Sequence, residues 1–393
     1  MISLSSLPSY LDLLKSTPLP IFIYGMGDGC LKLLGIFRRY GIPCAGIFAS
    51  DEFVRDKSFE GHRIRRLSEI ESAVEDFIVV LAFGAGYSSL IERIDGIARK
   101  HRLIVPDMPV VGEGLFTKQY LREHYSEITE VYSLLADEHS RLVYRKLIEY
   151  RITGELAPLK ACESDKAESY RLLSLSGSEV YVDLGAYTGD TVREYLEYTG
   201  GEHSGIIAVE PNARNFRKLS ESLFSESLLS ENTAGLSNIR LINAAVGAYD
   251  GVITVQKGGG RMIRRSDSGV QIRQITLDSL LEGEPCSPCG ELCSPGGKPD
   301  SIPDGTPCSP STPSVGEPMY IKYDVEGAEM DALKGSENTL RMYKPKLNVA
   351  LYHRVEDLFA LPLYIHSILP KHKLYIRHFP YYPAWDTNLY AVP

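Results

Sequence analysis

Short apolar runs recur along the second half of the chain, and each is followed by a polar turn. They span Val180 to Val182, Gly205 to Val209, Ile239 to Ile242 and Met319 to Tyr323. Continuous apolar runs of this kind are typical of strands that are buried on both faces of a parallel sheet and connected by helices. The pattern therefore predicts a doubly wound α/β sheet whose first strand begins at Val180.

The end of the chain adds one more strand and a predicted hairpin. The apolar run from Leu347 to Tyr352 leads directly into His353. The runs from Lys373 to Arg377 and from Asn388 to Val392 are predicted to pair as a terminal hairpin, with His378 at the inner end of its first strand. Both histidines are therefore expected at strand ends.

The first part of the chain, residues 1–114, has an α/β pattern of its own. Its predicted strands are Ile21 to Tyr24, Ala45 to Ala49 and Phe77 to Phe83, and a helix is predicted from Leu31 to Tyr40. This order of elements predicts a small Rossmann-like domain in front of the larger sheet.

A glycine turn from Gly25 to Gly29 follows the first strand of this domain. One interpretation is a nucleotide or nucleotide-sugar site there, with Asp51 on a ribose. Against it, Cys30 stands where the dinucleotide pattern has its third glycine, and Asp28 places a negative charge beside the helix start. A docking or substrate-presenting domain is the alternative, and both stay open.

A helical segment joins the two parts. From Leu115 to about Leu175, apolar residues recur at three- and four-residue steps, which predicts a helical connector. The expected organisation is a Rossmann-like domain over residues 1–114, the connector over 115–178 and the larger domain over 179–393. A length of 393 residues allows two domains with a core each.

Two segments interrupt the larger domain. Gly251 to Gln256 and Val270 to Thr276 alternate apolar and polar residues on either side of a glycine run, which predicts a β-hairpin. From Glu282 to Pro318, Pro, Gly, Ser and Cys dominate, and this composition predicts a disordered insertion. Its cysteine spacing, C-x2-C-x3-C-x14-C, raises a zinc hypothesis, but no histidine accompanies it.

The charge balance limits the partners of the protein. The chain has 42 Lys and Arg against 51 Asp and Glu, a net charge of -9, so no general basic surface for nucleic acid is expected. The first residues lack a basic region followed by an apolar core, and no apolar run is long enough to span a bilayer. A cytoplasmic location is therefore the expectation.

The turn from Asp183 to Thr191 is the first candidate binding site. A dinucleotide site needs a glycine where this chain has Tyr187, and it needs a bare helix N-terminus where this chain has Asp190. Asp190 or Thr191 is predicted to cap the helix that follows. Asp183 and Asp190 favour a ligand with cationic groups, such as the ammonium and sulfonium of S-adenosylmethionine, over NAD.

The ends of the next two strands extend this site. Glu210, followed by Pro211, ends the second strand about 20 residues beyond the glycine turn, where an acidic residue holds ribose hydroxyls in nucleotide-binding folds. The third strand ends at Asn243 and Ala244, whose backbone could contact an adenine. Together they predict a nucleoside site along the carboxyl edge of the sheet.

A second acidic cluster follows the strand that begins at Met319. Asp324, Glu326 and Glu329 lie at the strand end and in the first helical turn, and Gly327 allows the turn between them. The first and fourth strands flank the switch point of a doubly wound sheet, so Asp324 is expected to face the same crevice as Asp183.

The blocks VDLGAYTGDT, VEP, NAAVG, KYDVEGAEMDALKG, LYHRVEDL and LYIRHF, with a terminal NLYAVP, resemble in content and order those of the FkbM family of S-adenosylmethionine-dependent methyltransferases. The similarity covers roughly Glu179 to Pro393, and the insertion departs from the compact family pattern. It implies a seven-stranded Rossmann-like methyltransferase sheet and methyl transfer to a hydroxyl, often of a sugar or polyketide. The cofactor-binding residues that it implies are Asp183, Gly185, Ala186, Tyr187, Thr188, Gly189, Asp190, Thr191 and Glu210.

Methyl transfer to an alcohol needs a base, because the hydroxyl is a poor nucleophile until its proton is removed. His353 is the first candidate, since an imidazole titrates near neutral pH, and His378 is the second. Asp324 is expected to orient the acceptor or, together with Glu326 and Glu329, to hold a divalent cation.

Two other functions stay open at this point. The first is an NAD-dependent or nucleotide-sugar-modifying enzyme whose active site lies in the N-terminal domain. The second is a module that binds the cofactor without a reaction. The acceptor and the oligomeric state are not given by the sequence.

Overall fold

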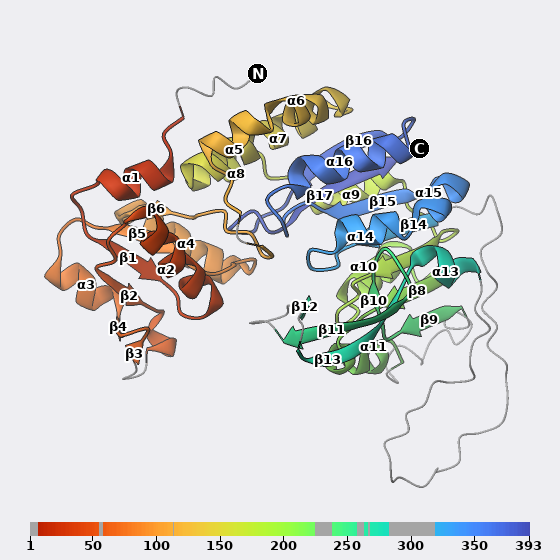
Figure 1. The fold of residues 1–393 in the computed structure, drawn as a ribbon, viewed down its shortest axis with the longest axis horizontal. Helices are drawn as coiled ribbons and strands as arrows, with labels where there is room; N and C mark the ends of the chain where they lie inside the picture. Colours follow the sequence, from red (N-terminus) through yellow and green to blue (C-terminus); the bar gives the residue numbers. More distant parts are fainter. Residues whose placement is uncertain are drawn as a thin grey trace, which may run out of the picture.

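The computed structural model describes residues 7–54, 58–112, 114–224, 238–257, 263–265, 268–282 and 319–393. Two α/β halves lie side by side, and the helices that connect them lie across the top of both (Figure 1). Each half has a sheet dominated by parallel strands, so the expected fold class is confirmed. The predicted insertion, its cysteines and its zinc hypothesis fall outside the described residues, except for Glu282.

The larger sheet has seven strands in the order β16-β17-β15-β14-β7-β8-β9. Its strands run parallel except for β17, which pairs antiparallel with both β15 and β16. The strand order reverses between the paired strands β7 and β14, so their carboxyl ends form the switch point where ligands bind in such sheets. The strands are β7 (Val180–Leu184), β8 (Gly205–Val209), β9 (Ile239–Ile242), β14 (Met319–Tyr323), β15 (Lys346–Ala350), β16 (Lys373–His378) and β17 (Thr387–Val392).

Helices cover both faces of this sheet, which explains why its central strands are apolar along their length. Every residue of β7 and β14 is buried. A strand with no exposed face has no reason to alternate polar and apolar residues. The helices are α10 (Asp190–Tyr198), α11 (Ala213–Phe224), α13 (Leu277–Glu282), α14 (Glu329–Lys334), α15 (Glu337–Tyr343) and α16 (Asp357–Ile368).

Most of the elements predicted for this half are confirmed, with small differences at their ends. The strand expected from Leu347 to Tyr352 already ends at Ala350, because the chain leaves the sheet there and the His353 carbonyl accepts a hydrogen bond from Val111 N–H at 2.8 Å.

A small four-stranded sheet, in the order β10-β13-β11-β12, flanks the larger one. The predicted pairing of the segments at 251–256 and 270–276 is confirmed, since β11 and β13 are antiparallel. A third strand, β12, pairs with the other edge of β11, so the segment is more than a simple hairpin. The strands are β10 (Ala245–Val246), β11 (Gly251–Lys257), β12 (Ile263–Arg265) and β13 (Val270–Ile275).

The first half contains a six-stranded sheet in the order β3-β4-β2-β1-β5-β6, parallel except for β3. This is the Rossmann-like arrangement that the sequence predicts for the region. The strands are β1 (Ile21–Tyr24), β2 (Gly46–Phe48), β3 (Ser58–Phe59), β4 (His62–Arg65), β5 (Ile78–Leu81) and β6 (Arg102–Ile104). The helices are α1 (Tyr10–Ser16), α2 (Asp28–Tyr40), the 3-10 turn η2 (Asp51–Phe53), α3 (Leu67–Ala73) and α4 (Ser88–Lys100).

The segment expected to be helical consists of five helices joined by short non-helical turns. The helices are α5 (Lys118–Glu123), α6 (Tyr125–Leu134), α7 (Glu138–Thr153), α8 (Leu156–Lys160) and α9 (Lys166–Leu173). Within the described ranges, none of the helices combines the length and apolar character needed to cross a bilayer.

The two halves are joined by close backbone contacts as well as by the connector. Ala85 and Tyr382 exchange two backbone hydrogen bonds, of 2.7 and 2.9 Å. A Cβ added at Gly86 would lie 2.6 Å from the Tyr381 ring, and one at Gly84 would lie 2.8 Å from Trp385. The turn after β5 therefore fits against the loop between β16 and β17 because it has no side chains at these two positions.

Candidate functional site

A cavity of about 510 Å³ lies at the carboxyl ends of β7, β8 and β14. Ile253, Val255 and Ile272 of the small sheet form an apolar wall, while Val111 and Gly112 reach it from the segment after β6. The sequence-predicted residues that line this cavity are Gly185, Tyr187, Asp190, Thr191, Glu210, Pro211, Ala244 and Asp324. We call it the cofactor cavity.

The turn after β7 brings its backbone close to the neighbouring strand. Gly185 has a φ of +97°, and a Cβ there would lie only 1.9 Å from the Asp324 carbonyl oxygen. Tyr187 also has a positive φ, of +48°, a conformation that is uncommon for a residue with a side chain. Strained positions of this kind cluster at ligand-binding sites.

The predicted cap of α10 is wrong. The N-cap residue is Gly189, in the left-handed conformation at a φ of +83°, and no side chain caps the helix. Asp190 is already the first helical residue, and the Thr191 hydroxyl donates its hydrogen bond to Asp183 instead. The start of α10 therefore depends on the left-handed conformation of Gly189 and not on a side-chain cap.

Glu210 lies at the end of β8, as the spacing predicts. Its carboxylate accepts hydrogen bonds from the backbone N–H groups of Tyr187 and Asn212, at 3.0 and 2.9 Å. Burial raises the pKa of Glu210 to about 7, although the hydrogen bonds to its carboxylate lower the pKa in part. A carboxylate fixed by backbone donors at the wall of a cavity is suited to accept hydrogen bonds from a ribose diol.

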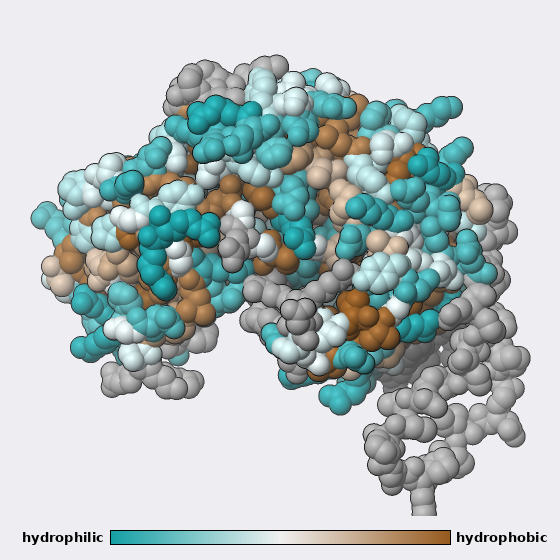
Figure 2. Space-filling view, in the orientation of Figure 1, coloured by the Kyte–Doolittle hydropathy of each residue, from teal (hydrophilic) through white to brown (hydrophobic). Residues whose placement is uncertain are grey.

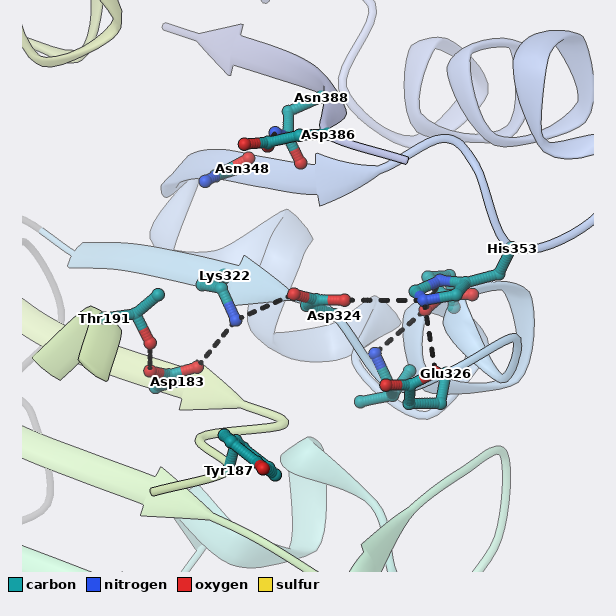
Figure 3. A network of polar contacts seen from close by, with 12 residues as sticks. Asp183, Tyr187, Thr191, Lys322, Asp324, Glu326, Asn348, His353, Asp386 and Asn388 are labelled. Carbon is teal, nitrogen blue, oxygen red and sulfur yellow. Dashed lines mark hydrogen bonds and ion pairs between the residues drawn. The ribbon is translucent and has the colours of Figure 1, made fainter. Parts of the chain in front are cut away.

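The predicted proximity of Asp183 and Asp324 is confirmed, but a cation stands between them. The Lys322 ammonium lies 3.3 Å from Asp183 and 3.3 Å from Asp324, as Figure 3 shows. Although burial acts in the opposite direction, the two carboxylates raise the pKa of Lys322 above its ordinary value. Asp183 is fully buried and lies outside the lining of the cofactor cavity, and its charge is already paired with that of Lys322.

His353 lies at the end of this polar row and is almost fully buried. Its Nδ1 lies 2.9 Å from Glu329 Oε1, and its Nε2 lies 3.6 Å from both Asp324 and Glu326. Burial alone would lower its pKa, but Glu329 and the other carboxylates outweigh it and raise the pKa to about 10. Without a bound cation, His353 is therefore protonated at neutral pH, which does not support the predicted role as a base.

A second cavity, of about 690 Å³, lies on the other side of this row. Asp190, Thr191, Lys322, Asp324, Glu326 and Tyr352 line both cavities. Figure 3 places Tyr187 on one side of Lys322 and Asp324, and Asn348, Asp386 and Asn388 on the other. The surface is hollowed between the two halves of the molecule (Figure 2). We call this second space the acceptor cavity.

Aromatic rings and polar groups form the walls of the acceptor cavity. The rings include Tyr381 and Trp385 of the larger half, Tyr170 of the connector and Phe83 of the first half. Lys32, Met26 and Gly29 of α2 and the turn before it also line it. Both halves therefore contribute to one cavity, which the sequence alone did not predict.

Two polar groups in these walls have buried atoms without a hydrogen-bond partner among the described residues: the indole nitrogen of Trp385 and Oδ1 of Asn348. One is a donor and the other an acceptor. Asp386 is nearby, and burial raises its pKa to about 6. A cavity that combines aromatic faces with such groups suits a ligand rich in hydroxyls, because a hydroxyl both donates and accepts.

Several predicted residues lie outside both cavities. Ala186, Thr188 and Gly189 shape the turn, and the Asn243 amide donates to the Glu210 and Pro211 carbonyls, at 2.8 and 3.2 Å. His378 is fully buried, its Nδ1 lies 3.0 Å from the Thr387 hydroxyl, and burial lowers its pKa to about 4. Its placement gives no support to a role as a base.

The glycine turn of the first half is covered by a side chain. A Cβ added at Gly25 would lie 2.5 Å from the Phe83 ring, and one at Gly29 would lie 1.9 Å from the Ala82 carbonyl oxygen. Asp51 is exposed in η2 and lines neither cavity. Gly25 and Gly29 thus allow close packing between β1, α2 and the end of β5.

Sequence reasoning missed Lys322, Tyr352 and Asp386. Lys322 lies inside an apolar strand, and the only signal in the sequence is a charged residue in a run that is otherwise buried. The Tyr352 hydroxyl donates to Asp324 at 3.1 Å. Asp386 lies in the loop before β17, where nothing in the local pattern distinguishes it.

No protein-family model matches the sequence, and no curated protein matches it. Among solved structures, the methyltransferase FkbM from Methylobacillus flagellatus KT matches with a TM-score of 0.65 and 21% sequence identity, over 97% of this chain and 92% of that chain. The precorrin-6y C5,15-methyltransferase from Geobacter metallireducens GS-15 matches with a TM-score of 0.30 and 10% identity, over 58% of this chain and 90% of that chain. The first of these matches shows that the chain has a Rossmann-like methyltransferase fold.

Proposed function

We propose that this protein is an S-adenosylmethionine-dependent methyltransferase that methylates a hydroxyl of a sugar, a glycan or a secondary metabolite. The observation that carries the proposal is the junction of the two cavities at Asp190, Lys322 and Asp324. A methyltransferase needs separate spaces for donor and acceptor that meet where the methyl group passes, and these two spaces meet in that way. The name of the matched methyltransferase agrees with this assignment.

The cofactor cavity offers suitable groups for each part of the donor. Glu210 is placed to accept hydrogen bonds from the ribose, and Ala244 with the apolar wall of Ile253 and Ile272 is suited to an adenine. Asp190 and Asp324 leave carboxylates at the end of the cavity where a cationic group would lie. When bound, the cofactor would supply a methyl group on a sulfonium, and these residues would bind and orient it.

The residues of the acceptor cavity would orient a hydroxyl toward that methyl group. Holding the reacting atoms in line can supply much of the rate enhancement of a displacement reaction. Tyr381 and Trp385 offer faces on which a sugar ring can pack, and Asn348 and Asn388 offer hydrogen bonds. Asp386, with a pKa of about 6, is ionised at neutral pH and is our candidate to accept the hydroxyl proton.

In this proposal the N-terminal domain, residues 1–114, is part of the acceptor site. Met26, Lys32 and Phe83 form its share of the wall. This favours the substrate-presenting interpretation of the first domain.

The direct test uses the full-length protein. Calorimetry with S-adenosylhomocysteine should show binding, and incubation with methyl-labelled cofactor and a panel of hydroxylated acceptors should place the label on an oxygen. Tight binding of NAD without binding of S-adenosylhomocysteine would refute the proposal. Label found on nitrogen or carbon alone would keep the cofactor assignment and refute the hydroxyl acceptor.

A further inference from the structure

We propose that Asp324, Glu329 and His353 bind a divalent first-row metal ion at the junction of the two cavities. One oxygen from each carboxylate and one nitrogen of the imidazole all lie within 4.8 Å of one another. The residues come from the ends of β14 and β15 and from the start of α14. Three potential ligands from separate elements thus meet at a single point.

The contacts of His353 resemble a metal site more than a set of hydrogen bonds. Its Nε2 lies 3.6 Å from Asp324 Oδ1 and 3.6 Å from Glu326 Oε2, which is too long for hydrogen bonds. Its Nδ1 lies 2.9 Å from Glu329 Oε1. Carboxylates on both sides of one imidazole hold it in a fixed orientation, as metal-binding histidines are usually held.

A second observation concerns Glu329, which is 1% exposed. Its Oε1 accepts hydrogen bonds from the backbone N–H groups of Val325 and Gly327, at 2.8 and 3.3 Å. Its Oε2 is buried and has no hydrogen-bond donor among the residues that the structure describes. A buried carboxylate oxygen without a partner is costly, and a cation at this point would satisfy it.

The backbone beside the cluster is strained in a way that presents a further carboxylate. Glu326 has a φ of +54° and Gly327 a φ of +92°. Glu326 lines both cavities, so its carboxylate is positioned at the rim of the cluster. A non-glycine residue in this conformation is uncommon, and such residues are enriched at ligand-binding sites.

The ligand set indicates the class of ion. Mg²⁺ and Ca²⁺ prefer sites made of oxygens, whereas an imidazole nitrogen with carboxylates suits ions such as Mn²⁺, Fe²⁺ or Zn²⁺. Because Asp324 lines both cavities, an ion there could contact an acceptor hydroxyl and lower its pKa. This last role rests on the proposed function, but binding of the ion does not.

The test is a titration of the metal-free, full-length protein with Mn²⁺ alone, followed by electron paramagnetic resonance. We expect one Mn²⁺ per chain, and affinities at least tenfold lower in Asp324→Asn and His353→Gln. His62→Gln, a histidine of β4 in the first sheet, is the matched control and should bind as the parent does. Excess Mg²⁺ or Ca²⁺ should displace the ion poorly.

Absence of binding, or equal binding by all four proteins, would refute the site. Binding that survives Asp324→Asn but is lost in a Cys286→Ser, Cys289→Ser variant would assign the ion to the cysteine-rich segment and also refute it. Circular dichroism of each variant shows whether it is folded, and Glu329→Gln gives an independent test if His353→Gln is not. Binding of S-adenosylhomocysteine, measured in parallel, separates failure of this site from failure of the proposed function.

Discussion

The Lys322 ammonium lies 3.3 Å from a carboxylate oxygen of Asp183 on the neighbouring strand, in the interior of the seven-stranded sheet. Asp183 is 0% exposed, and its other oxygen accepts hydrogen bonds from the Tyr181 and Thr191 hydroxyls. The ion pair connects the two central strands at the junction of the cavities. Because Lys322 also contacts Asp324, the pair both stabilises the sheet and positions the Asp324 carboxylate.

Replacing Lys322 with Met should destabilise the protein strongly. The substitution leaves the buried Asp183 charge without its cation, and breaking a buried pair in this way costs about 3–5 kcal/mol. The free energy of unfolding, measured by urea denaturation, should fall by this amount. Arg93→Gln is the matched control, because it breaks the exposed Arg93–Glu52 pair, which water screens, and should lower the free energy of unfolding far less. Equal losses in the two variants would contradict the buried-pair interpretation.

Glu210→Gln should separate cofactor binding from stability. The pKa of Glu210 is raised from 4.5 to about 7 in the folded protein, so the folded state holds this proton more tightly than the unfolded state. Its contribution to stability is therefore favourable at low pH and is lost as the pH rises from about 4.5 to about 7. Gln cannot ionise, so the unliganded variant should lack this pH dependence, while its NH2 group replaces an oxygen that accepts from a backbone N–H.

The same variant should bind S-adenosylhomocysteine about 10 to 100 times more weakly, because a hydrogen bond to a charged acceptor contributes about 1.5–3 kcal/mol. Urea denaturation at pH 5 and pH 8 and calorimetry measure the two effects. Unchanged affinity would remove Glu210 from the cofactor site.

The sheet could be predicted from the sequence because its central strands are buried on both faces. Apolar runs such as those of β7 and β8, with helices between them, are typical of strands in a parallel sheet that is covered on both faces. The spacing between the glycine turn and Glu210 likewise follows from one βα unit of regular length. These features depend on residues that are close in sequence.

The rest depends on contacts between distant residues, which no local pattern records. Lys322 neutralises Asp183, 139 positions away, so of the two carboxylates in the glycine turn only Asp190 is left to face a ligand. Phe83 covers Gly25, and Trp385 lies against Gly84. The pKa of His353 is raised by three carboxylates that lie between the end of β14 and the start of α14. The sequence around His353 does not show these neighbours.

Asp386→Asn should slow methyl transfer while leaving cofactor binding intact. Burial raises the pKa of Asp386 from 3.8 to about 6, so the carboxylate is ionised above pH 6 and protonated below it. The rate constant of the parent should therefore fall as the pH drops through about 6, and the variant should lack this limb. Loss of a general base typically costs 10²–10⁴-fold in rate. A variant that keeps the parent rate and pH profile would exclude Asp386 as the proton acceptor.

Gly185→Ala should disrupt the junction of β7 and β14 far more than a typical glycine substitution. A Cβ at Gly185 would lie 1.9 Å from the Asp324 carbonyl oxygen, a backbone atom that cannot move without displacing β14. The φ of +97° adds the strain of a left-handed alanine. We expect loss of S-adenosylhomocysteine binding and a fall of about 3 kcal/mol in the free energy of unfolding, at the upper end of the range for overpacked sites. Gly200→Ala is the control, since Gly200 has a φ of +67° with open space around it and should lose only about 1 kcal/mol. Similar losses in both variants would show that backbone conformation alone, and not the contact with Asp324, determines the requirement for glycine.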